Sequence, residues 1–303
     1  MLNIKKLGGD KMSKLKYRIK KGTKRFVSKH NNKKYSEDLY ESAFHKEIDW
    51  NNPTEFNEKL MCLKVLKYND DPLVWNCVDK YQVRLFALSR GINEKHLPEL
   101  VGVYKHSKDI KETDLPDKFV IRCTHGYDYN IVCNDKKDFD LKKAKRNLNR
   151  WQKSKFGYDT GELHYTHTIP KIIVEKFAPE NKNQPDYKLY CFNGKPLVVL
   201  VCTEREDNVK LNFYDLKWNE LMLAKDEYRG RKRPNPPRYL HDMVGIAKKL
   251  SHGFPFVRID FYEAKDRVML GDMVFTPSAC LATYYSEEGS KYLSNLLDLR
   301  VIK

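Results

Sequence analysis

Glycine and proline are scarce in this 303-residue sequence, which has 14 of the first and 13 of the second. The scarcity excludes a collagen-like or low-complexity chain, and a hydrophobic content of 41% excludes a disordered one. Long apolar runs are missing too, because the longest, Leu197 to Cys202, is far too short to span a membrane. The chain is long enough for one large domain or two smaller ones.

Cysteine pairs at metal-binding spacing are also absent. The seven cysteines are odd in number and widely scattered, which argues against a zinc finger and against a disulfide framework. We therefore expect a cytoplasmic protein.

Acidic residues are almost missing from the first 34 positions, which hold thirteen Lys or Arg and only Asp10. This segment carries most of the formal net charge of +16, and the remaining chain is close to neutral. Met12, Leu15, Ile19 and Phe26 recur at helical spacing among the basic residues. Residues 1–34 are therefore either a peripheral anchor on an anionic membrane surface or a solvated tail, with nucleic-acid binding the weaker alternative.

A helical region is expected after this arm. The Pro53-Thr54 step predicts a helix reaching about Leu66 with Thr54 as its cap, and a second helix is expected over Val78 to Ser89. Later in the chain, Asp140 is expected to cap a helix that runs through Trp151, and a further helix is expected from Leu240 to Leu250.

Strand patterns begin at Phe119. Residues 119–123 and 130–133 predict a hairpin, and 172–177 predict a further strand. Asn193-Gly194 joins strands over 187–192 and 196–202, because this dipeptide tolerates the positive φ angles of a tight turn. Two more strands are expected over 256–262 and 268–275. The mixture of hairpins and helices indicates an α+β chain with antiparallel sheets.

The last two expected strands carry the most informative polar residues. If they pair as neighbours, Asp260 and Asp272 project from one face and can share a hard cation such as Mg²⁺. Arg258 alternates onto the same face as Asp260, where it can meet a phosphate. On spacing alone, solvated carboxylates with Arg258 as their ion-pair partner are the more common arrangement.

Other cations lie in apolar surroundings. Lys188 and Arg122 stand on predicted strands and need anions, for which a nucleotide phosphate and a protein carboxylate are the two candidates. His125-Gly126 ends a strand at a turn where backbone N–H groups can meet phosphate. A basic loop with prolines, Arg229 to Arg238, is either a contact for a polyanionic substrate or simply exposed.

Seven motifs in order resemble the TupA-like ATP-grasp family, which is associated with bacterial cell-surface polysaccharide synthesis and is often labelled glycosyltransferase. The resemblance covers about residues 36 to 303. The motifs are NPTEFNEKL (52–60), VDKYQVR (78–84), FVIRCTHG (119–126), PDYK (185–188), CFNG (191–194), NFYD (212–215) and FPFVRID (254–260).

The resemblance implies an ATP-grasp fold divided into a basic arm (1–35), a mainly helical N-terminal region (36–117), a lid subdomain (118–177) and a C-terminal subdomain (178–303). It also implies ATP and Mg²⁺ as cofactors, and activation of a carboxylate to an acyl phosphate that an amine then attacks. By position, Arg122, His125, Gly126, Asp186 and Lys188 would contact the nucleotide. Glu175, Lys176 and Phe177 would form the adenine hinge, Asp260 and Asp272 would hold the metal, and Arg258 and Lys188 would be catalytic.

Several positions depart from the family pattern. Arg122 replaces a lysine, and Tyr127-Asp128-Tyr129 replaces a glycine-rich run after His-Gly. Asp272 replaces a glutamate, and Val274 stands where an oxygen ligand is usual. The small glycine-containing turn after Pro277 has become Ser278-Ala279-Cys280. Together these changes indicate weakened nucleotide or metal binding, a different donor, or lost catalysis.

Three functions follow for this chain. The first is an ATP-dependent carboxylate–amine ligase that acts on a surface polysaccharide, of capsule or teichuronopeptide type, or on its sugar-carboxylate precursor. The second is a glycosyltransferase or other transferase, against which the absence of an Asp-x-Asp metal pair counts. The third is a catalytically degenerate ATP-grasp scaffold.

Overall fold

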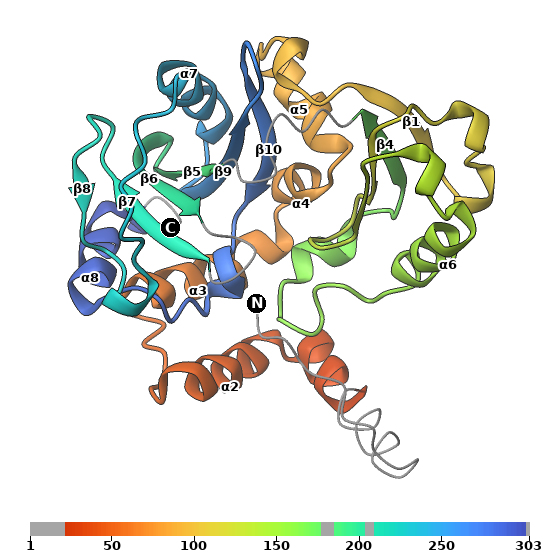
Figure 1. Cartoon of the computed structure of the whole chain (residues 1–303). Helices are drawn as coiled ribbons and strands as arrows, with labels where there is room; N and C mark the ends of the chain where they lie inside the picture. Colours follow the sequence, from red (N-terminus) through yellow and green to blue (C-terminus); the bar gives the residue numbers. More distant parts are fainter. Residues whose placement is uncertain (1–21, 177–184, 204–208, 301–303) are drawn as a thin grey trace.

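The computed structural model describes residues 22–176, 185–203 and 209–300. Two antiparallel sheets form separate lobes, with α4 and α5 between them (Figure 1). After a helical segment over residues 22–30, the helices are α2 (Asn32–Phe44), α3 (Phe56–Leu66), α4 (Pro72–Val78), α5 (Gln82–Ser89), α6 (Leu141–Gln152), α7 (Leu240–Ser251) and α8 (Glu287–Leu296). The strands are β1 (Leu100–Tyr104), β2 (Phe119–Cys123), β3 (Asn130–Cys133), β4 (Ile172–Lys176), β5 (Asp186–Phe192), β6 (Lys195–Thr203), β7 (Lys210–Tyr214), β8 (Glu220–Leu221), β9 (Phe256–Glu263) and β10 (Val268–Val274).

The larger sheet has the strand order β10-β9-β5-β6-β7-β8, with every neighbouring pair antiparallel. The predicted β5–β6 hairpin is confirmed, and its turn residues Asn193 and Gly194 have φ angles of 48° and 78°. One face of the sheet packs on α3, whose Phe56 ring contacts the rings of Tyr190 and Phe256. The part of this face that α3 leaves uncovered holds the polar residues of β5 and β9.

The smaller sheet has the order β1-β4-β2-β3 and its own apolar core. The predicted β2–β3 hairpin and the strand now named β4 are confirmed. The helix capped by Asp140 is α6, whose Leu148 is fully buried against this sheet. β1 pairs with β4 although its residues fall in the range expected to be mainly helical, so this sheet begins earlier in the chain than residue 118.

Two predicted helix boundaries are wrong. The cap of α3 is Glu55, not Thr54, because Glu55 and Glu58 form a reciprocal capping box. The helix expected over 78–89 begins only at Gln82, as α5, because the Asp79 side chain accepts from the backbone N–H groups of Tyr81 and Gln82. Val78 is instead the last residue of α4. The predicted helical spacing in the arm lies mostly outside the described residues. No helix in the described part of the chain is both long and apolar enough to cross a membrane.

Candidate active site

A cleft of about 1410 Å³ lies between the two lobes. Its walls come from β2 and β4 on one side, from β5, β9 and β10 on the other, and from the α4–α5 junction. Five basic and five acidic side chains line it: Lys80, Arg122, Lys176, Lys188 and Arg258, with Asp128, Glu175, Asp186, Asp260 and Asp272.

A break in the β9–β10 pairing brings the two expected metal carboxylates to this cleft. Leu270 pairs with Phe261 and Met273 pairs with Ile259, so Gly271 and Asp272 together oppose Asp260. The backbones approach closely here, because a Cβ on Gly271 would lie 2.9 Å from the carbonyl oxygen of Asp260. Both carboxylates line the cleft, as the expected strand pairing requires.

Asp260 is held tightly by two cations. Its two oxygens accept from Arg258 Nε at 2.7 Å and Nη2 at 2.8 Å, and one accepts from Lys188 Nζ at 2.9 Å. Burial alone would raise the pKa of Asp260, but Arg258 and Lys188 outweigh burial and hold this pKa below its usual value. Lys188 also lies 3.4 Å from Asp186. Arg258, Lys188 and Asp260 therefore form one ion cluster.

Asp272 is held more loosely and is more accessible. Its carboxylate lies 3.3 Å from Arg122 Nη2 and 3.8 Å from Lys80 Nζ, and its side chain is 34% exposed. Burial opposes ionisation, yet the nearby cations, Lys80 first and Arg122 second, lower the pKa of Asp272 well below its usual range. Asp272 is thus ionised and has the weaker hydrogen bonds of the two carboxylates.

Arg122 joins the small sheet to this cluster. Its guanidinium lies between Asp272 and Glu175, 3.5 Å from the latter, and Arg84 pairs with Glu175 from the other side at 3.2 Å. The Nε of Arg122 is buried and has no hydrogen-bond partner among the described residues. A buried unpaired donor is costly, and an anion in the cleft would satisfy it.

Lys80 was not identified from the sequence as a site residue, although its motif carried the family resemblance. It follows α4 at the bend between α4 and α5, where its ammonium donates to the Gly126 carbonyl at 2.6 Å. The side chain is only 7% exposed, and burial lowers its pKa. The sequence signal that could have identified it is a lysine next to Asp79, in the turn that precedes α5. The sequence does not show, however, in which direction the lysine side chain points.

The turn after β2 brings neither of its predicted nucleotide-binding residues, His125 and Gly126, into the lining of the cleft. Tyr127, Asp128 and Tyr129 line it, whereas His125 is buried behind, with Nε2 3.0 Å from the Trp151 carbonyl. Gly126 has a φ of 142°, and a Cβ there would meet the Phe156 ring at 2.9 Å. The backbone at His125-Gly126, which was expected to approach a ligand, therefore lies beside the ring of Phe156.

Only part of the expected adenine hinge lies within the described residues. Glu175 and Lys176 line the cleft, and Phe177 lies outside the described residues. The Glu175 side chain is buried between two arginines, and its backbone lies within β4, paired with β1 on one side and β2 on the other. Lys176 pairs with Glu99 at 3.2 Å near solvent.

The floor of the cleft rests on Glu162, a buried carboxylate that sequence reasoning missed. It accepts from the hydroxyl groups of Thr160, Thr276 and Tyr127. Burial raises its pKa despite these donors. Beyond Thr276 the chain turns through Ser278, Ala279 and Cys280, all with φ between 52° and 67°, a conformation that costs energy in non-glycine residues.

The metal-binding capacity of the site is limited. Within the described residues, no group of three or more His, Cys, Asp and Glu side chains is placed to hold a metal ion. Val274 lines the cleft two residues after Asp272 and offers no ligand atom. Asp260 and Asp272 are two cleft carboxylates, and Mg²⁺ is usually bound through one or two carboxylates beside substrate phosphates.

The profile of the family described as TupA-like ATPgrasp matches residues 58–297. The chain belongs to the TupA-like ATP-grasp family. Its α+β architecture of two antiparallel sheets around a cleft is therefore an ATP-grasp fold, as the sequence predicted. A search of curated proteins found no match.

Three solved structures similar to this ATP-grasp protein show low sequence identity to it. The D-alanine–D-alanine ligase of Bacillus anthracis with ATP is 10% identical, with a TM-score of 0.39 over 66% of this chain and 54% of the ligase. The corresponding ligase of Helicobacter pylori is 14% identical, with a TM-score of 0.39 over 74% and 62%. The L-amino acid ligase of Bacillus licheniformis is 12% identical, with a TM-score of 0.44 over 81% and 55%. The chain thus spans about half to two thirds of the length of these ligases.

Proposed function

We propose that this protein is an ATP-dependent ligase that joins a carboxylate to an amine. In the first step a carboxylate oxygen attacks the γ-phosphorus of ATP, which gives an acyl phosphate and ADP. In the second step an amine attacks the acyl carbon, the phosphate leaves with the bonding electrons, and the amine loses a proton. Both steps depend mainly on positioned cations around phosphate oxygens.

The supporting observation is the ion cluster that faces the cleft from both lobes. Lys80 and Arg122 approach from one side, and Lys188 and Arg258 from the other. The cleft volume and the unpaired Nε of Arg122 suit a bound nucleotide anion. We assign Lys80 and Arg122 to the phosphates that leave as ADP, and Lys188 and Arg258 to the transferred phosphoryl group.

Asp260 and Asp272 fit a magnesium site completed by nucleotide phosphate, with Asp272 the more available ligand. When bound, the metal ion neutralises charge that develops on the transferred group. Asp260 has a further task in this proposal, because it orients Arg258 and Lys188 through three short hydrogen bonds. Its loss would misplace both cations.

The substrate that we propose is a cell-surface polysaccharide or its sugar-carboxylate precursor. The support for this choice is that Tyr127, Tyr129, Tyr228 and Tyr284 line the cleft, because tyrosine combines an apolar ring with a polar hydroxyl group. Isothermal titration of the folded full chain with Mg-ATP tests the nucleotide part of the proposal. We expect saturable binding, and no detectable binding at millimolar Mg-ATP would refute the ligase assignment.

A catalytically inactive scaffold is the second candidate, and Val274 with the strained Ser278–Cys280 turn favours it. The two candidates differ in turnover. A ligase releases phosphate from ATP when a carboxylate substrate and an amine are present, and Arg258→Met abolishes that release. A scaffold binds nucleotide but releases no phosphate from it, and Arg258→Met leaves the amount of polysaccharide that the cell makes unchanged.

A further inference from the structure

A second hollow of about 870 Å³ lies at the outer edge of the six-stranded sheet, beside β7 and β8. We call it the basic hollow, because five basic and three acidic side chains line it. The basic residues are Lys210, Arg229, Arg231, Lys232 and Arg233, and the acidic ones are Glu220, Asp226 and Glu227.

The three acidic residues of the basic hollow leave an excess of two positive charges. Arg233 pairs with Glu220 at 2.6 Å, and Arg229 pairs with Asp226 at 2.5 Å. Lys210 donates to the backbone carbonyl of Glu227, which carries no net charge. Arg231 and Lys232 are exposed, and neither has an ion-pair partner within the described residues. The hollow is therefore attractive to an anion.

The chain that carries these cations is fixed rather than loose. Gly230 lies so close to β7 that a Cβ would come 2.4 Å from Asn212 Oδ1, and Asn212 Nδ2 donates to the Gly230 carbonyl. Leu211 on β7 also bridges to Arg229. Beyond the basic run, the Trp218 indole donates to the Pro234 carbonyl at 3.0 Å. Arg231 and Lys232 thus stand on a segment anchored at both ends.

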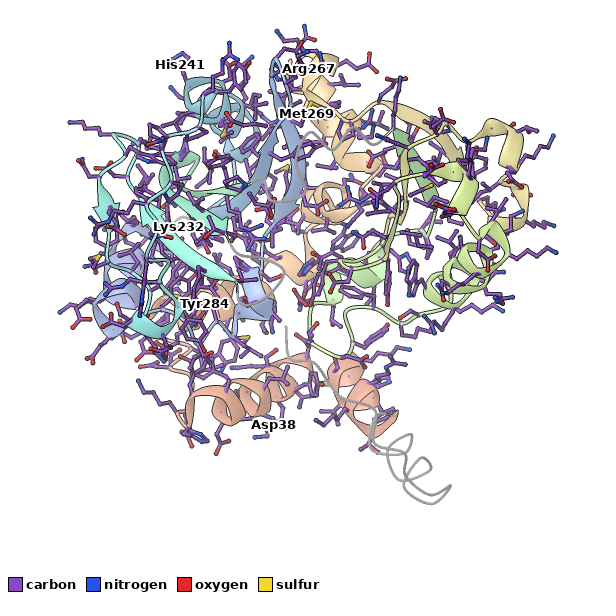
Figure 2. The ribbon with its side chains drawn as sticks, viewed as in Figure 1. Asp38, Lys232, His241, Arg267, Met269 and Tyr284 are labelled. Carbon is purple, nitrogen blue, oxygen red and sulfur yellow. The ribbon has the colours of Figure 1, made fainter. Side chains whose placement is uncertain are left out.

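The same segment also borders the catalytic cleft. Tyr228 lines the cleft with Tyr284, and their ring centroids are 6.3 Å apart. Its two neighbours in sequence, Glu227 and Arg229, line the basic hollow instead. In Figure 2 the labelled Lys232 and Tyr284 both lie on the lobe of the six-stranded sheet. One short stretch of chain therefore forms a wall between the two spaces.

We propose that the basic hollow is a second binding site for the substrate, which is a polyanionic chain. One unit of this chain reacts in the cleft, and the neighbouring charged units pass Tyr228 and bind at Arg231 and Lys232. The inference rests on the proposed ligase function, because a ligase of this kind needs a carboxylate, and a chain with an acid group on each unit supplies both the reacting group and the neighbours. From β5 to the edge segment is three strand spacings, about 14 Å, so a single unit cannot reach both places.

The test measures how affinity depends on chain length. Fluorescently labelled oligogalacturonates of two and ten units are titrated into the full-length protein, its Arg231→Gln/Lys232→Gln variant, and the control Lys142→Gln/Lys143→Gln. The control removes two exposed charges from α6 on the other lobe. For the wild type and the control we expect the ten-unit chain to bind more tightly than the two-unit chain. In the first variant the long chain should lose about 2- to 30-fold in affinity, the sum expected for two exposed ionic contacts.

Parallel titrations with short and long polyphosphate show whether carboxylate or phosphate chains are preferred, and either preference supports the proposal. Equal losses in both variants, or no effect of length, overturn it. A length effect with single-stranded oligonucleotide alone also overturns it, because that result assigns the hollow to nucleic acid. Mg-ATP titration of the same proteins separates the two proposals. Unchanged ATP binding without a length effect rejects only the hollow, and a length effect without ATP binding rejects only the ligase.

Discussion

Asp260 and Asp272 differ in how firmly the protein holds them. Replacing each by asparagine should therefore lower the free energy of unfolding by different amounts. The side chains of Asp260, Arg258 and Lys188 are only 16%, 14% and 13% exposed. An asparagine at position 260 keeps one acceptor oxygen but turns an amide N–H₂ towards two cations. Breaking a buried ion pair from one side costs about 3–5 kcal/mol, because the remaining charges are left uncompensated.

Asp272→Asn is the matched comparison. Its carboxylate is 34% exposed, and its nearest cationic nitrogen lies 3.3 Å away. Ion pairs of such exposure contribute about 1 kcal/mol or less. With a urea m-value of about 3 kcal/mol/M, Asp260→Asn should lower the unfolding midpoint by about 1–1.7 M and Asp272→Asn by about 0.3 M or less.

Urea titration followed by tryptophan fluorescence measures both midpoints. Metal-free ATP provides an internal check, because a ligand that binds only the folded state raises the midpoint by mass action. ATP with a chelator should raise the midpoint of Asp260→Asn more than that of the wild type, since Arg258 and Lys188 then meet phosphate alone. Equal destabilisation by the two substitutions, without preferential rescue by ATP, would refute the idea that Asp260 mainly orients these cations.

Three further predictions address other parts of the molecule. Burial lowers the pKa of His164 from 6.5 to about 3, so the folded protein keeps it neutral; its contribution to stability is present above pH 6.5 and is lost as the pH falls towards 3. Between pH 7 and 5 the wild type should lose about 2 kcal/mol that His164→Gln does not, and parallel urea curves would contradict this. Lys80→Met should weaken Mg-ATP binding about tenfold or more in calorimetry, through the loss of a charged hydrogen-bond donor, whereas the exposed Lys153→Met should not. Vesicles with anionic lipid should retain the full chain but not one lacking residues 1–34, and equal retention would remove the membrane role of the arm.

Local signals in the sequence predicted much of the fold. Asn193-Gly194 predicted its hairpin because few dipeptides accept positive φ at both positions, and Asp140 predicted the start of α6 because its side chain accepts from Lys143 N–H. Helix α4 was not predicted, although Asp71-Pro72 is a helix start in its own right. β1 was also missed, since an edge strand is defined by its partner, β4, which lies far away in sequence.

The site was less predictable, because its groups meet only through long-range packing. Alternation along β9 correctly placed Arg258 beside Asp260, since residues two apart in a strand share a face. No local pattern shows that Arg122 from the small sheet reaches Asp272, 150 residues away, or that Lys80 lies beside the same carboxylate. Glu162 reads as an ordinary polar residue in sequence, and only the hydroxyl groups packed around it explain its burial.

The charges of the cleft bear on the departures from the family pattern. Its five basic side chains are matched by five acidic ones, so the walls are formally neutral. A triphosphate alone would leave this space strongly negative, and a divalent cation that binds with the nucleotide offsets part of that charge. Val274 removes one candidate ligand, but it does not change this balance when the usual oxygen ligand is a neutral side chain such as asparagine, because both residues are then uncharged. The carboxylates that now orient Arg122, Lys188 and Arg258 are the groups that a nucleotide-borne cation needs. Because the cleft is formally neutral, we expect metal-bound ATP to bind more tightly than free ATP, which titration with and without a chelator measures.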